Sequence, residues 1–138
     1  MKQVLPWLVL LLFCMSFPAS LAASDKGRAW LDAQKDPAAI NVNGSWDSDE
    51  WGTLHLKQAE GSRDVSGNGG GYEITGVVSG KKLFMLFLTK STVEYCAILS
   101  ADDDNNTLTG SYSTRKSRFK GGLCQESSRP MNMNRKGK

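Results

Sequence analysis

The chain has 138 residues, of which 40% are hydrophobic, 22% charged and 9% aromatic, and its formal net charge is +3. This composition is typical of one ordinary globular domain, so it excludes a disordered tail protein, a collagen-like repeat and a multidomain enzyme. The single histidine excludes most catalytic and zinc-binding sites that need two imidazoles.

Residues 1–23 have the pattern of a secretory signal peptide. Lys2 supplies the positive start, a dense apolar run follows, and small residues offer cleavage after Ala22 or Ala23. The apolar run is shorter than the roughly 20 residues that a membrane-spanning helix needs. We therefore expect an exported protein, secreted or periplasmic. The alternatives are an uncleaved anchor and a lipid-anchored start at Cys14.

Residues 24–43 are expected to form a short helix and an extended lead-in. Ser24 is a suitable N-cap, and Pro37 ends the helical pattern. Ile40 and Val42 then alternate with asparagines, which is typical of extended chain.

Short strands separated by turn residues are predicted after this lead-in. Their apolar residues alternate, and no helical pattern lies between them, which indicates an antiparallel meander. The run 83–88 is apolar at every position, so we predict that this strand is central and buried on both faces. The predicted strand regions are 51–57, 63–67, 72–78, 83–88, 93–99 and 108–112.

The predicted fold class is all-β, with the meander over residues 44–124 closed into a small barrel. Closure is favoured because it removes sheet edges that would otherwise aggregate. Four glycines within the strand patterns permit bends: Gly52, Gly67, Gly76 and Gly110. A two-sheet sandwich is the alternative.

Residues 125–138 are predicted to be a basic, flexible tail. Positive charge is concentrated near this end, since residues 115–138 carry a net +7 and residues 24–114 a net −5. Such a block could make weak contact with an anionic surface, although a solvated tail is the simpler interpretation. Phe119 is the one aromatic residue within the block, so we expect no nucleic-acid partner.

Two cysteines, Cys96 and Cys124, remain once the signal peptide is removed. An even pair in an oxidising compartment predicts one disulfide. It would enclose 27 intervening residues, and a loop of that length stabilises by roughly 3–4 kcal/mol in the chain-entropy model. Free or metal-binding thiols are the alternative.

The tripeptide Gly44-Ser45-Trp46 stands just before a strand and is followed by glycine-punctuated hairpins. This pattern, over residues 44–112, resembles the opening of lipocalin and avidin-like barrels. The resemblance implies that Trp46 closes one end of the barrel and that the other end opens onto a ligand. The candidate ligand-binding residues are Trp46, Trp51, Tyr72, Phe87 and Tyr95. The chain is short for a lipocalin, and it lacks the tryptophan-rich biotin lining of avidins.

Few residues suggest catalysis. Asp47, Asp49 and Glu50 lie between two tryptophans, so a small hydrolase acting on envelope polymers is one hypothesis, because paired carboxylates and aromatic faces serve glycoside chemistry. A solvated loop is the simpler interpretation. His55 is flanked by leucines and is expected to point outward. Residues 102–106 are oxygen-rich but lack the spacing of a calcium loop, and a turn is expected there.

The sequence therefore predicts an exported, monomeric barrel that binds a small apolar ligand or a partner protein. We expect no catalysis, metal or cofactor. A periplasmic inhibitor or immunity-type protein is the alternative within the same size class. No residue pattern selects its target.

Overall fold

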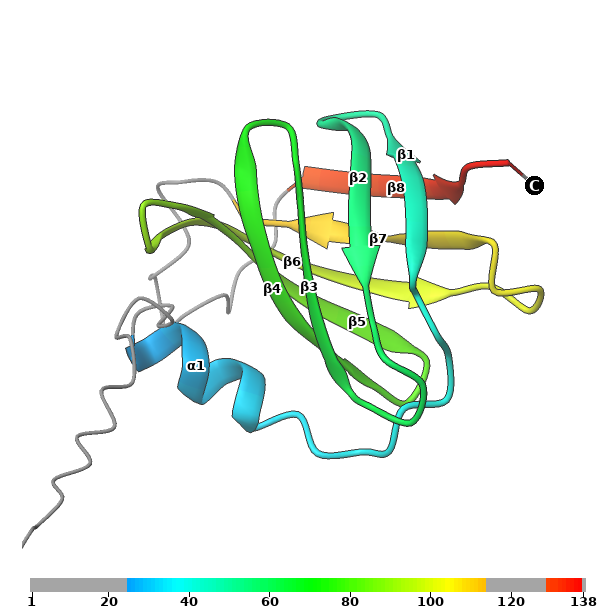
Figure 1. Cartoon of the computed structure of the whole chain (residues 1–138), viewed down its shortest axis with the longest axis horizontal. Coiled ribbons are helices and arrows are strands. Elements are labelled where there is room, and N and C mark those ends of the chain that lie inside the picture. Colours follow the sequence, from blue (N-terminus) through cyan, green and yellow to red (C-terminus); the bar gives the residue numbers. More distant parts are fainter. Residues whose placement is uncertain (1–24, 114–128, 138) are drawn as a thin grey trace, which may run out of the picture.

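The computed structural model of the chain describes residues 25–113 and 129–137. Within them, one helix, α1 (Asp25–Asp32), precedes a closed barrel of eight strands (Figure 1). Each strand pairs antiparallel with the next, and the last strand pairs with the first. The strands are β1 (Gly44–Ser48), β2 (Gly52–Lys57), β3 (Asp64–Gly69), β4 (Tyr72–Ser79), β5 (Lys82–Thr89), β6 (Thr92–Ala101), β7 (Thr107–Tyr112) and β8 (Arg129–Arg135). The predicted meander and its closure are confirmed, and the sandwich alternative is wrong.

The predicted flexible tail over residues 125–138 is wrong for residues 129–135, because these form β8. This strand pairs with β7 on one side and β1 on the other. Met131 and Met133 are 1% and 0% exposed, and they alternate with exposed polar residues and Pro130. Two apolar side chains among asparagines and arginines are a weak sequence signal for a strand. The strand is stable only because it pairs with a neighbouring strand on each side. The barrel domain therefore extends beyond the predicted boundary at residue 124.

The inside of the barrel is filled with side chains. Alternate residues of the strands meet there, as the alternation of apolar residues predicts, and their side chains are almost entirely excluded from solvent. An eight-stranded barrel is just wide enough for its side chains to fill. The largest fully buried interior residues are Trp46, Phe87, Leu54, Leu83, Met85, Leu99, Leu108, Met131 and Met133.

A second apolar cluster lies outside the barrel, where α1 covers β5. Leu31 is fully buried in this cluster, and the Trp30 ring meets the Phe84 ring edge-on at 5.6 Å between centroids. In Figure 1 the blue helix lies beside the barrel wall. Six consecutive residues of β5 are buried, which confirms the prediction of a strand covered on both faces. Among the described residues, no helix has the length and apolar character to cross a membrane.

Two glycines permit neighbouring strands to approach closely. A Cβ atom on Gly76 would overlap the carbonyl oxygen of Phe84, and one on Gly110 would overlap that of Ile98. Both overlaps involve backbone of the adjacent strand, which a side-chain movement could not relieve. Close approach of the neighbouring strand therefore requires glycine at both positions.

One end of the barrel is closed by residues 33–43, which we call the strap. Figure 1 shows this cyan segment running from α1 to β1. Gln58 holds the strap, because its Oε1 accepts a hydrogen bond from Val42 N (2.8 Å) and its Nε2 donates to Ile40 O (3.2 Å). Trp46 Nε1 donates to Val42 O (2.9 Å). We call this the Trp46 end.

Arg135, the last residue of β8, joins the strap to this end. Its guanidinium carbon lies 4.4 Å from the centroid of the Trp46 ring, close enough for a cation–π interaction. Nη1 donates to Asn43 O (2.9 Å), and Nη2 donates to Asn41 O (3.0 Å) and Asn105 O (3.2 Å). One planar side chain therefore ties β8, the strap and the β6–β7 turn together.

We predict that Arg135→Ala lowers the free energy of unfolding by about 2–3 kcal/mol, because several hydrogen bonds to a charged group and a cation–π contact are lost together. Arg135→Lys should restore only part of the loss, since an ammonium lacks the planar fork of donors. Urea unfolding followed by tryptophan fluorescence measures the change. Lys136→Ala, at an exposed neighbouring position, is the control. Equal stability of the Arg135→Ala variant and the control would contradict this account.

Candidate functional site

Aromatic rings converge at the barrel end opposite Trp46. This end contains the β1–β2, β3–β4 and β5–β6 turns and the last residue of β7. We call the group of rings there the aromatic mouth. Its members come from five segments that lie apart in the sequence, and they are Trp51, Tyr72, Phe87, Tyr95 and Tyr112.

The rings of the aromatic mouth form two layers. Phe87 is fully buried and forms the floor. Trp51 stacks on it, with 4.4 Å between centroids and 18° between planes. The Tyr72 ring meets two rings edge-on, with centroid distances of 6.0 Å to Phe87 and 5.8 Å to Tyr95. The Tyr112 ring meets the Trp51 ring edge-on, with 4.7 Å between centroids. Trp51, Tyr72 and Tyr95 are half-buried, so each of them keeps part of its surface open to solvent.

Short turns fix the position of the Trp51 ring. The backbone N–H of Trp51 donates to Ser48 Oγ (2.9 Å), which anchors the turn to the end of β1. On the other side, a Cβ atom on Gly70 would lie 2.8 Å from Trp51 Cδ1. Gly70 has a φ of +61°, a conformation that favours glycine. The glycine-rich β3–β4 turn therefore packs directly against the indole.

Tyr112 adds a titratable group to the aromatic mouth. Burial raises the pKa of its phenol above the ordinary value of 10.0, and the carboxylate of Glu50 raises it further. Both effects disfavour the negatively charged phenolate. Arg129 acts in the opposite direction as a smaller influence than Glu50. The mouth thus combines apolar ring faces with a polar edge.

The structure brings together four of the five predicted ligand-binding residues, namely Trp51, Tyr72, Phe87 and Tyr95. Trp46 lies instead at the opposite end, fully buried beneath Arg135. Tyr112 is a further member of the site and is not among the five predicted residues. Its position in the alternating run 108–112 already indicated that it shares a face with Leu108, whose side chain is fully buried.

The candidate catalytic residues are spread over different surfaces. Asp47 is exposed on the barrel wall and accepts a hydrogen bond from Thr53 Oγ1 (3.1 Å), whereas Glu50 lies beside Tyr112 at the mouth. Asp49 is exposed on the same turn as Glu50. His55 points outward as predicted, and its Nδ1 lies 3.0 Å from Ser45 Oγ. The structure does not bring the three carboxylates into one site.

The acidic segment 102–106 forms the β6–β7 turn, as predicted. Asp102 Oδ1 accepts a hydrogen bond from Thr107 N (3.1 Å), and Asp104 Oδ1 accepts one from Asn106 N (2.9 Å). The backbone hydrogen bond from Asn106 is the largest cause of a lowered pKa at Asp104. Within residues 25–113 and 129–137, no group of three or more potential ligand side chains is arranged to hold a metal ion.

Comparison of the chain with models of known protein families and with curated proteins gave no match. The candidate site therefore rests on the geometry of the aromatic mouth.

Replacing Glu50 should lower the raised pKa of Tyr112. In Glu50→Gln the pKa should fall but stay above 10.0, since burial is the larger cause. Tyrosine absorbance or carbon NMR across alkaline pH measures it. Asp49→Asn, on the same turn, is the control for a change of charge.

The raised pKa of Tyr112 also predicts how stability depends on pH. The stability that Tyr112 contributes is fully present below its pKa in the unfolded chain. It is lost as pH rises through its higher pKa in the folded protein, because the unfolded chain releases the phenol proton more readily.

An unchanged Tyr112 pKa in Glu50→Gln, or equal effects of Glu50→Gln and Asp49→Asn, would contradict the proposed contact between Glu50 and Tyr112.

Proposed function

We propose that this protein is an exported binding protein that holds a small, ring-shaped apolar molecule at the aromatic mouth. The observation that carries the proposal is the convergence of five aromatic rings, three of them half-buried, at one end of a closed barrel. Ligand sites of this type are lined mainly by apolar and aromatic groups with a few polar atoms for orientation.

The filled interior supports a ligand at the mouth instead of one deep inside the barrel. Phe87 and the residues below it already exclude solvent, so a guest there would have to displace packed side chains. At the rim, Trp51, Tyr72 and Tyr95 are half-buried, so each residue keeps part of its surface open to solvent. Stacking on such a ring contributes about 0.5–1.5 kcal/mol beyond the burial of apolar area.

A relationship to lipocalin and avidin-like barrels is part of this proposal. Two observations support it: the closed antiparallel meander and the position of Trp46 at the end opposite the aromatic mouth. Fold alone does not identify a ligand. The choice of ligand class therefore rests on the rings and their polar edge.

Binding of N-phenyl-1-naphthylamine, an uncharged fluorescent probe with planar rings, tests the proposal. We expect saturable binding to the wild-type protein and a loss of affinity of about tenfold or more in Trp51→Ala, because the stacking surface is removed. Tyr72→Ala should weaken binding less. Trp30→Ala, which removes an equal side chain from α1 on the outside of the barrel, is the matched control and should bind like wild type.

Circular dichroism of each variant checks that the barrel still forms. If folded Trp51→Ala and Tyr72→Ala both bind the probe as tightly as Trp30→Ala, the aromatic mouth is not the site.

The proposal also includes export and a disulfide between Cys96 and Cys124. Residues 1–23 and Cys124 lie outside the described residues. In support, Cys96 lies buried in the barrel wall, and Cys124 is the only other cysteine in the sequence beyond the predicted signal peptide. A bond to Cys124 would fasten the segment between β7 and β8 to the wall of the barrel.

Protein made in an oxidising compartment should resist thiol labelling until a reductant is added, and its mass should be lower by two hydrogens. Cys96→Ala should then expose one reactive thiol at Cys124. Complete labelling of both cysteines in the unreduced native protein would rule out the bond.

A further inference from the structure

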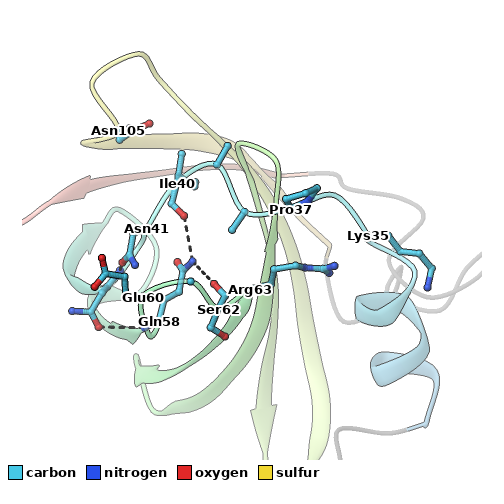
Figure 2. A pocket seen from close by; sticks show the side chains of 13 residues that line it. Lys35, Pro37, Ile40, Asn41, Gln58, Glu60, Ser62, Arg63 and Asn105 are labelled. Carbon is cyan, nitrogen blue, oxygen red and sulfur yellow. Dashed lines mark hydrogen bonds between the residues drawn. The ribbon is translucent and has the colours of Figure 1, made fainter.

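A depression of about 920 Å³ lies at the Trp46 end of the barrel. The strap forms one side, the β2–β3 turn (residues 58–63) forms the other, and Asn105 stands at the rim (Figure 2). The aromatic mouth is at the opposite end, so a ligand bound here would be independent of the proposed function.

The lining of the depression is divided by charge. Lys35 and Arg63 lie together toward α1, whereas Glu60, Asn41 and Asn105 lie toward the other side (Figure 2). The charged side chains of Lys35, Arg63 and Glu60 form no ion pair with another described residue. One side therefore offers cationic donors, and the other offers a carboxylate and amide oxygens.

Two buried polar atoms of the lining lack hydrogen-bond partners. They are Arg63 Nε, a donor, and Asn105 Oδ1, an acceptor. A buried polar atom without a partner is rare and costs free energy, so each of these atoms calls for an explanation. The unpartnered donor is on the cationic side and the unpartnered acceptor is on the oxygen-rich side.

Gln58 makes the frame of the depression rigid. Its Nε2 donates to Ser62 O (2.9 Å) as well as to Ile40 O, and its Oε1 is occupied by the strap. Arg63 Nη2 donates to Gln34 O at the start of the strap, which holds the guanidinium in place. These interactions hold the strap and the β2–β3 turn at a fixed separation before any ligand binds.

We propose that this depression binds a short zwitterion, an amino acid or small peptide. Its carboxylate would lie against Arg63 and Lys35, and its ammonium group would lie against Glu60 and Asn105. A guanidinium suits a carboxylate, and such charge-assisted hydrogen bonds are the stronger kind. A simple anion or a simple cation would leave one side of the depression unpaired.

Titration of the ¹⁵N-labelled protein with triglycine tests the proposal by NMR. We expect shifts in the amide signals of residues 38–41 and 61–63 and in the Arg63 Nε–H signal, which gains a hydrogen-bond partner. N-acetyl-triglycine amide has the same backbone without the two charges. It should bind about tenfold or more weakly, because each lost charge removes a charge-assisted hydrogen bond.

Variants with matched charge changes locate the site. Lys35→Gln and Glu60→Gln should each weaken triglycine binding several-fold, and both positions are exposed, so the fold should be retained. Lys57→Gln and Glu73→Gln, at exposed positions outside the depression, should bind as wild type does. Trp51→Ala should also leave triglycine binding unchanged, which separates this site from the aromatic mouth.

Two results would overturn the proposal. One is the absence of any shift at these signals with triglycine up to about 10 mM, a concentration that would detect even millimolar affinity. The other is equal binding of triglycine and its blocked analogue, because the two charges would then play no part.

Discussion

The eight strands form a closed barrel because β8 pairs with β1. This pairing is the last ladder needed to close the barrel, and it removes the two edges that an open sheet would expose. The same pairing sets Trp46 opposite Arg135, so the guanidinium lies over the indole and reaches the strap. Closure of the sheet and closure of one end of the barrel thus have a common origin.

This arrangement leaves the two ends of the barrel with different chemistry. The interior is filled, so binding surfaces are confined to the ends and the wall. At the Trp46 end, the strap and the β2–β3 turn leave a polar depression with separated charges. At the other end, short turns carry aromatic rings that stack on Phe87. The two proposed sites therefore differ in chemistry, one polar with separated charges and the other aromatic.

Much of the fold could be predicted because its strands are marked by patterns among residues adjacent in the sequence. The apolar run 83–88 and the alternation in the neighbouring strands depend on adjacent residues, and the structure follows them. The strand β8 was not predicted, because its two methionines are buried only once it pairs with β7 and β1, which are distant or weakly signalled in the sequence. The polar depression could not be predicted at all, since Arg63 and Asn105 come together only after the barrel closes.

We propose that a packed, closed barrel holds its ligand at the aromatic mouth. A crystal structure of the protein purified from its own host, with whatever it retains, tests this most directly. We expect a small ring-shaped molecule stacked on Trp51, with the interior residues around Met85 still packed. A molecule enclosed within the barrel, or a partner protein covering the wall and leaving the mouth empty, would contradict it.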